Sequence, residues 1–515
     1  MPKDTQITHE LFMRMSIDEQ NEWISGTLPP GNSLNMNKLQ IEACRLILTG
    51  HCVALLGGPG SGKSFTTDRA DYLLHILSPS TEFARTATTG MASTHLNNGK
   101  TLYNWLKTGT ASCLSYTDAF SKRLQTDLSG VILKNTDVFQ VDEASMLSDT
   151  AFSHIVNAAT KHRNNHSEYL GGMRVILSGD IMQLPVIPGT AGAGNKRKYT
   201  VPLISILENL PYNIKKITLT ENMRSDGDLK HQAIIKAIVQ QDPLVRKRAV
   251  ELLNEYCYKE PLSPIEALNY SESTGMTIIT PTNHQVELYN KNQMELLRKR
   301  NPSGPIFIGR AKPLHEWKDL DPIVKANLQD ENGLKMEENH IRDQKRFEDD
   351  LSLYEGQSIM LRKNTEDYKN GEKCQFISVS EDRTVMTVSR YSDKAILKVT
   401  KCDLTSEYQP KIGFEQFPVI KDAAMSVHKA QGSTETGGII FDPDGLTCFK
   451  KDTARVLYVA VSRTQSLSKI ILTEKIDPDI IVNDLCQREL QRLWHIDYMS
   501  HYPKITLEEL NAAFA

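Results

Sequence analysis

Residues 57–64 read GGPGSGKS and lie between the apolar run CVALL at 52–56 and the helix-like stretch FTTDRADYLLHIL at 65–77. The spacing of Gly57, Gly62, Lys63 and Ser64 is typical of a loop that wraps nucleotide phosphates. Glycine lets backbone N–H groups point at anionic oxygens, and the N-terminus of the following helix adds positive potential. We expect Lys63 to reach the terminal phosphates and the Ser64 hydroxyl to bind Mg²⁺. The predicted nucleotide-binding residues of the loop are Gly57, Gly58, Pro59, Gly60, Ser61, Gly62, Lys63, Ser64 and Phe65.

Such loops occur in kinases, GTPases, transporters, proteases and motors, so the surrounding chain must decide the function. Short apolar runs such as VFQV, RVILS, TIIT and GGIIF alternate with helical patterns. This alternation predicts an α/β fold with parallel sheets, whose functional residues lie at the carboxyl ends of the strands. Two clusters of such runs indicate two domains, at 34–215 and at 216–300 joined with 418–475.

Residues 301–417 interrupt the second cluster, first with a charged stretch at 318–351 and then with closely spaced short strand patterns. We therefore predict that a small antiparallel β-barrel is inserted there. Residues 1–33 are predicted to be an N-terminal extension and linker, and 476–515 a helical cap. A chain of 515 residues is long enough for this number of domains.

The composition of the chain indicates in which cellular compartment the protein works and which partners it can bind. The chain has no run of eighteen apolar residues and no apolar leader at its start, which predicts a cytoplasmic protein, or a nuclear one in a eukaryote, that is neither secreted nor membrane-bound. Its eight cysteines form no C-x-x-C pair, so neither zinc nor a disulfide framework is indicated. The net charge is −3, so a nucleic-acid partner would require positive charge concentrated in a channel.

Several polar residues lie where nucleotide hydrolysis needs them. Asp142 and Glu143 end a predicted strand, where one carboxylate can hold Mg²⁺ and the next can orient the attacking water. Gln183, after a third strand, can sense the terminal phosphate. Arg224 and Arg463 lie in apolar contexts and are candidates to stabilise the transferred phosphoryl group.

Two further stretches, 86–106 and 426–434, are rich in hydroxyls, amides and glycine and poor in acid. Such side chains suit a nucleic-acid backbone when base sequence is not read. Trp105 could stack on bases, although an isolated aromatic residue is more often part of the core.

Nine ordered motifs together resemble the superfamily-one DNA helicases, and most closely their B branch, which holds RecD, the PIF-type helicases and the phage helicase Dda. The motifs are MNKLQIEA, GGPGSGKS, TATTGMASTHL, VDEASM, GDIMQLP, LTENMR, TPTNHQVELYN, AMSVHKAQGST and LYVAVSRT.

The resemblance implies two RecA-like P-loop NTPase domains and an SH3-like barrel as the insertion. It implies ATP and Mg²⁺ as cofactors, and 5′ to 3′ movement on single-stranded DNA with unwinding of duplex, in replication, recombination or repair. Gln40 would read the adenine, Ser64 and Asp142 would bind the metal, and a strand-separating wedge would lie within 106–135. Catalytic roles would fall to Lys63, Asp142, Glu143, Gln183, Arg224 and Arg463. DNA would contact Thr88, Thr89, Gly90, Ser93, Trp105, His428, Lys429, Gln431, Gly432, Ser433 and Thr434.

The implied partners are single-stranded DNA and its junctions with duplex, with replication or single-strand-binding proteins as further candidates. Two alternatives stay open at this point. One is a viral-type superfamily-one RNA helicase, and the other is a nucleic-acid-binding scaffold with an inactive motor. Intact Lys63 and Glu143 argue against the scaffold.

Overall fold

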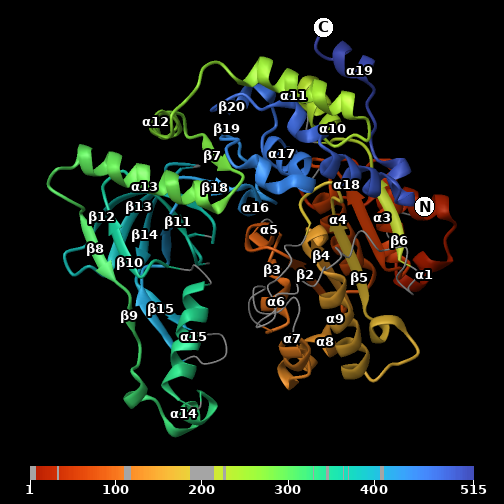
Figure 1. Ribbon diagram of the computed structural model, residues 1–515. Helices are drawn as coiled ribbons and strands as arrows, with labels where there is room; N and C mark the ends of the chain where they lie inside the picture. The colour runs from red at the N-terminus through yellow and green to blue at the C-terminus, as the bar shows by residue number, and fades with distance from the viewer. Residues whose placement is uncertain are drawn as a thin grey trace.

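The computed structural model describes residues 7–31, 34–94, 96–108, 118–185, 214–223, 228–328, 330–343, 347–363, 365–368, 370–391, 393–405 and 411–515. Two parallel sheets lie side by side, and an elongated lobe of mostly antiparallel strands extends from the second (Figure 1).

The first sheet has six parallel strands in the order β3-β2-β4-β5-β1-β6. Alternate residues of β1 face opposite cores: Val53 and Leu55 pack with helices α3 and α4, whereas Ala54 and Leu56 pack with helices α6 to α9. Burial on both faces explains why the central strands β1 and β5 read as nearly continuous apolar runs. The strands are β1 (Val53–Gly57), β2 (Phe83–Ala87), β3 (Lys100–Thr101), β4 (Val138–Asp142), β5 (Arg174–Gly179) and β6 (Lys215–Leu219). The helices are α3 (Lys38–Leu48), α4 (Lys63–Leu77), α5 (Gly90–Thr94), α6 (Leu102–Trp105), α7 (Asp118–Leu124), α8 (Asp127–Asn135) and α9 (Asp149–His162).

The second sheet has four parallel strands in the order β18-β7-β19-β20 and is surrounded by helices (Figure 1). Its strands are β7 (Thr277–Thr280), β18 (Met425–Ser426), β19 (Ile439–Phe441) and β20 (Ile470–Leu472). Its helices are α10 (Leu229–Ile238), α11 (Pro243–Cys257), α12 (Pro264–Thr274), α13 (Asn283–Arg300), α16 (Val427–Ala430) and α17 (Thr453–Val461). The α/β fold with parallel sheets that the sequence predicts is therefore confirmed.

The inserted lobe leaves the second sheet after α13 and returns before β18. A five-stranded antiparallel sheet, β14-β13-β12-β11-β17, shares one apolar core with the pair β8–β10. Beyond it, β15, β16 and β9 pack with helices α14 and α15 around a separate small core. The main strands are β8 (Phe307–Arg310), β10 (Asp350–Leu353), β11 (Ser358–Leu361), β12 (Lys373–Val379), β13 (Val385–Arg390), β14 (Ile396–Thr400) and β17 (Val419–Lys421). The outer elements are β9 (Lys312–Pro313), α14 (Pro322–Leu328), α15 (Glu331–Asp343), β15 (Cys402–Thr405) and β16 (Gly413–Gln416).

Three expected boundaries differ from the observed packing. Strand β6 spans 215–219 and pairs with β1, so the first sheet continues past the expected end at residue 215. Strand β17 pairs with β11, so the insertion continues past residue 417. Helices α1 (His9–Arg14) and α2 (Ile17–Gly26) bury Phe12 and Ile24 in the core of the first sheet instead of forming a loose extension. In each case a long-range pairing or contact sets the boundary.

The C-terminal segment is folded against the second sheet through α18 (Asp484–Trp494) and α19 (Leu507–Ala512). The seven cysteines in the described part of the chain are free thiols. No helix within the described ranges has the length and apolar character needed to cross a membrane.

Candidate active site

The phosphate loop joins β1 to α4, as its sequence predicts. Gly62 caps α4 in the left-handed region with φ of 84°, and a Cβ there would lie 2.4 Å from the Gln40 side-chain nitrogen Nε2. Only glycine meets both conditions. The Lys63 ammonium group donates to the carbonyl oxygens of Gly57 and Gly58 at 2.8 and 3.1 Å. The cation is thus held within the loop by backbone oxygens.

Gln40, predicted to read the adenine, has two structural contacts at the base of this loop. It is buried, its Oε1 accepts the N–H of Asn37 at 3.0 Å, and its Nε2 donates to the carbonyl of Ser61 at 3.3 Å. The side chain therefore caps α3 and ties that helix to the loop. Its contact with adenine stays a prediction.

Asp142 and Glu143 lie at the carboxyl end of β4, next to the phosphate loop. The Ser178 hydroxyl donates to one Asp142 carboxylate oxygen at 2.7 Å. Glu143 has a left-handed backbone, with φ of 52°, and its buried Oε2 has no hydrogen-bond partner among the described residues. Burial, then the Asp142 charge, raises the pKa of Glu143 to about 7, against the attraction of Lys63 and Arg463. A carboxyl group tuned in this way suits proton transfer near neutral pH.

A cavity of about 420 Å³ brings residues of both parallel sheets together. Gln183 reaches it from the loop after β5, and its Oε1 is buried without a partner among the described side chains and backbone. Arg463 reaches it from the segment after α17, where its guanidinium donates to the carbonyl oxygens of Val459 and Ser433 at 2.8 and 3.0 Å. The cavity is lined by Leu34, Asn35, Pro59, Gly60, Ser61, Gly62, Lys63, Ser64, Phe65, Ala92, Asp142, Glu143, Gln183, Met223, Gly432, Ser433, Thr434 and Arg463. Arg224 lies outside the described residues.

The residues expected to hold Mg²⁺ fit that ion. Ser64 and Asp142 line the same cavity and offer the oxygen ligands that Mg²⁺ prefers. The Ser178 hydroxyl donates to one Asp142 oxygen at 2.7 Å. Since a carboxylate has two oxygens with several lone pairs, Asp142 can still bind a metal ion.

The residues predicted to face DNA fall into several environments. Gly432, Ser433 and Thr434 line the nucleotide cavity. Gln431 is buried and donates to the Ser145 hydroxyl of the first domain at 3.4 Å. Thr88 donates its hydroxyl to the carbonyl of Glu143 at 2.9 Å. These contacts place the motif residues at the domain junction.

The other polar candidates make contacts within their own domains. Thr89 accepts the N–H of Ala92 at the start of α5, and the Ser93 hydroxyl donates to the carbonyl of Gly90. His428 packs against the Phe449 ring, and Lys429 contacts Asp422 at 3.2 Å. Their contacts with DNA stay predictions.

Trp105 corrects one sequence prediction. Its side chain is 8 % exposed and stacks on Phe139 of β4, with ring centroids 5.4 Å apart. A ring held in this way cannot stack on bases, so the prediction that Trp105 contacts DNA is wrong. Tyr103 is buried beside it, edge-on to Phe120.

A buried network that the sequence reading missed joins the two domains behind the phosphate loop. Asp180 follows β5, and its two carboxylate oxygens accept from the hydroxyls of Tyr502 and Tyr458 at 2.6 and 2.5 Å. The two hydroxyls lie 3.1 Å apart. Burial, followed by the Asp180 charge, raises the pKa of both tyrosines well above the ordinary value, so they remain donors. No local motif marks Tyr502, because its partner is 322 residues away.

Two helicase family models match parts of the chain. Residues 36–245 match a PIF1-like helicase model, and residues 423–471 match a UvrD-like helicase C-terminal domain. The chain is 33 % identical over 160 residues to the ATP-dependent DNA helicase Pif1 of Psychrobacter, which covers 31 % of this chain and 23 % of that protein. It is 24 % identical over 411 residues to the ATP-dependent DNA helicase Pif1 of Bdellovibrio bacteriovorus, across 79 % of this chain and 82 % of that protein.

Solved Pif1 structures share the fold. The Candida albicans Pif1 helicase superposes with a TM-score of 0.65 at 18 % identity, covering 89 % of this chain and 99 % of that one. Bacteroides Pif1 bound to single-stranded DNA superposes with a TM-score of 0.60 at 17 % identity, covering 92 % of this chain and 100 % of that one. The two parallel sheets thus correspond to RecA-like domains.

Proposed function

We propose that this chain, a PIF1-like superfamily-one helicase, uses ATP hydrolysis to move along single-stranded DNA from 5′ to 3′ and to separate duplex DNA ahead of it. The observation that supports this is the single cavity with Lys63, Glu143 and Gln183 from one RecA-like domain and Arg463 from the other. Hydrolysis at such a junction can be coupled to relative movement of the two domains.

The chemistry follows from the positions of these side chains. Lys63 would neutralise the terminal phosphates, and Ser64 and Asp142 would hold Mg²⁺, which when bound would supply charge compensation for phosphoryl transfer. Glu143 orients the attacking water with its unpartnered oxygen. Gln183 and Arg463 bind the terminal phosphate from opposite domains, so that ATP favours closure and its hydrolysis favours separation.

Nucleic acid is proposed to cross the domain junction near α5 and the stretch 426–434. DNA is supported as the substrate because two relatives are ATP-dependent DNA helicases and a Bacteroides Pif1 structure contains single-stranded DNA. Junctions of single-stranded and duplex DNA are the proposed substrates, and replication or single-strand-binding proteins the proposed partners.

The inserted sheet is proposed to be an SH3-like barrel that forms one wall of the DNA channel. Its five antiparallel strands and the β8–β10 pair surround one core, as a small barrel requires. The free thiols support the proposal of a reducing compartment, the cytoplasm or nucleus.

Unwinding of matched duplexes with a 5′ or a 3′ single-stranded tail tests this proposal. We expect ATP-dependent strand separation of the 5′-tailed duplex and ATPase stimulation by single-stranded DNA above that by RNA of equal length. Affinity for DNA should fall linearly with salt on logarithmic axes, because neutralised phosphates release counterions. Stimulation by RNA alone would favour an RNA helicase, and binding without turnover would favour a scaffold.

A further inference from the structure

The inserted lobe and the second RecA-like domain face each other across a cavity of about 750 Å³. One wall consists of α12, α13 and the start of β7, and the other consists of β11, β12 and β13. Residues 434–437, which continue from the lining of the nucleotide cavity, complete it. Thr434 lines both cavities. The junction of the lobe with the motor therefore lies next to the nucleotide site.

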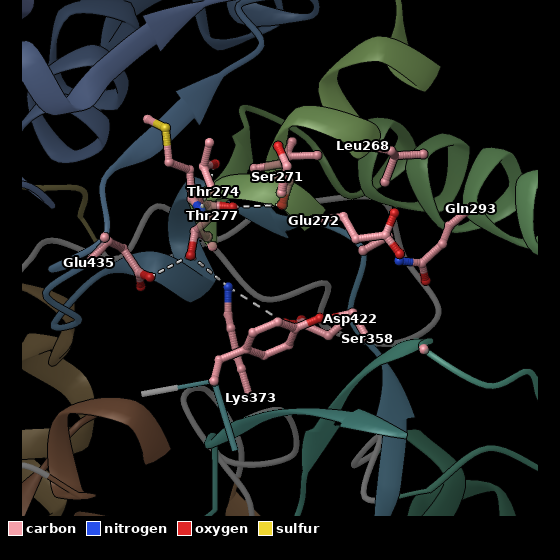
Figure 2. A pocket seen from close by; sticks show the side chains of 18 of the residues that line it. Leu268, Ser271, Glu272, Thr274, Thr277, Gln293, Ser358, Lys373, Asp422 and Glu435 are labelled. Atoms are coloured by element: carbon pink, nitrogen blue, oxygen red, sulfur yellow. Dashed lines mark hydrogen bonds and ion pairs between the residues drawn. The ribbon is translucent and has the colours of Figure 1, made fainter. Parts of the chain in front are cut away.

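Lys373, the first residue of β12, extends from the lobe into this cavity (Figure 2). Its ammonium group donates to the Thr277 hydroxyl of β7 at 3.0 Å. It also lies 3.6 Å from the Asp422 carboxylate, in the segment where the chain returns from the lobe. One side chain thus joins the inserted sheet to the motor domain at two points.

The contact with Thr277 continues toward the nucleotide site. The Thr277 hydroxyl donates in turn to Glu435 at 2.6 Å (Figure 2). The other Glu435 oxygen accepts from the Ser433 hydroxyl at 2.9 Å. The Glu435 N–H donates to the carbonyl of Arg463 at 2.7 Å, and the Arg463 guanidinium donates to the carbonyl of Ser433 at 3.0 Å. Hydrogen bonds therefore run without interruption from Lys373 to the arginine that lines the nucleotide cavity.

The contact with Asp422 forms a second branch. The Asp422 side chain is fully buried and also accepts from Lys429 at 3.2 Å. Lys429 belongs to the stretch expected to contact DNA. A buried carboxylate requires cationic partners, and Asp422 contacts two of them, so separating either one weakens the compensation of its charge. Movement of the 428–435 stretch should therefore displace Lys373 through both sets of contacts, one by way of Thr277 and the other by way of Asp422.

We propose that Lys373 is a positioning residue that passes nucleotide-dependent movement of the 433–435 segment and Arg463 into the inserted lobe. This inference rests on the proposed helicase function. Because Lys373 is far from the phosphate loop along the hydrogen-bond chain, its loss should leave ATP turnover largely intact. The lobe would then no longer follow domain closure, and less strand separation would result from each ATP hydrolysed.

Lys373→Met tests this, since it removes the charge and the donor while preserving length and much of the packing. We expect DNA-stimulated ATPase activity within about threefold of wild type and unwinding per ATP reduced about tenfold, the loss that one charge-assisted hydrogen bond represents. Lys373→Arg, which keeps a cationic donor, should restore most of the unwinding per ATP. Lys398→Met is the matched control, because Lys398 is exposed on β14 of the same sheet and donates to the Thr387 hydroxyl of β13 at 2.7 Å, outside the lining of the cavity.

Thr277→Val provides the second variant, because it interrupts the chain without changing a charge. If both residues act in one chain, the double variant should unwind no worse than Lys373→Met. Unchanged unwinding per ATP, additive losses in the double variant, or loss of ATPase in Lys373→Met would each overturn the inference. Wild-type protein in the same assay separates this from failure of the proposed function, which would leave the wild type itself without DNA-stimulated turnover or unwinding.

Discussion

Tyr502→Phe is the sharpest test of how the two RecA-like domains are held together. The substitution removes one hydroxyl and keeps the ring, so packing in the core is preserved. Asp180 then loses the donor at 2.6 Å and retains the Tyr458 hydroxyl and the N–H of Met182 at 3.0 Å. Because Asp180 is fully buried, water cannot readily replace the missing donor.

The expected loss follows from the kind of hydrogen bond removed. A hydrogen bond to a charged group contributes about 1.5–3 kcal/mol, and a loss of about 2 kcal/mol corresponds to roughly thirtyfold in an equilibrium or a rate. Asp180 also anchors the loop that carries Gln183, whose N–H donates to the Asp180 carbonyl at 3.1 Å. We therefore expect kcat for DNA-stimulated ATPase to fall by up to roughly thirtyfold, with little change in KM for ATP, because the phosphate loop itself is unaltered.

Steady-state ATPase assays at saturating single-stranded DNA measure this, alongside the thermal unfolding temperature. Tyr256→Phe is the matched control, because Tyr256 is an exposed tyrosine of α11. Its hydroxyl accepts a long, weak hydrogen bond of 3.4 Å from Lys230. If Tyr502→Phe has the kcat and unfolding temperature of wild type, the Asp180 network has no role in joining the domains. If KM alone rises, the tyrosine acts on nucleotide binding and the reasoning is equally refuted.

Four further variants have expected outcomes. Lys63→Ala should abolish ATP turnover, whereas Glu143→Gln should retain nucleotide binding and lose at least about 100-fold in kcat; wild-type hydrolysis by Glu143→Gln would exclude it as the water-orienting group. Trp105→Ala should lower the stability by about 3–5 kcal/mol, because the contact with Phe139 is lost. The salt dependence of DNA binding by the folded protein should not change, and a change would indicate that Trp105 contacts DNA. Burial lowers the pKa of His231 below 6.5 in the folded protein, so as pH falls the unfolded chain binds a proton at this position before the folded protein does. The stabilisation present above pH 6.5 is therefore lost as pH falls through the folded pKa. Between pH 7 and pH 5 the unfolding temperature should fall less in His231→Gln than in wild type, and parallel curves would contradict this.

The features that could be predicted from the sequence are those formed by short, continuous segments of the chain. The strand, loop and helix around Lys63 are local, and so is the place of Asp142 at the end of β4. Trp105 was misjudged because a ring beside a polar stretch is compatible with either surface or core, and only the pairing of β2 with β4 brings Phe139 beneath it. The domain boundary was misplaced because β6 pairs with β1 across a long separation that no local pattern records. Tyr502 and Lys373 carried no signal for the same reason.

The contacts of α17 indicate how the domains can move. Arg455 donates to the carbonyl of Ile181 at 3.1 Å and also contacts the carbonyl of Gln183, while Tyr458 binds Asp180. The same helix ends at Val461, two residues before Arg463 and about 4.5 Å further along its axis than Tyr458 at the usual rise per residue. A helix fixed to the first domain at one place, with Arg463 of the nucleotide cavity just beyond its end, can swing that arginine within the cavity without leaving its anchor. Closure on ATP should therefore be a rotation about the 180–183 loop, and weakening this anchor should reduce kcat while ATP still binds to the phosphate loop.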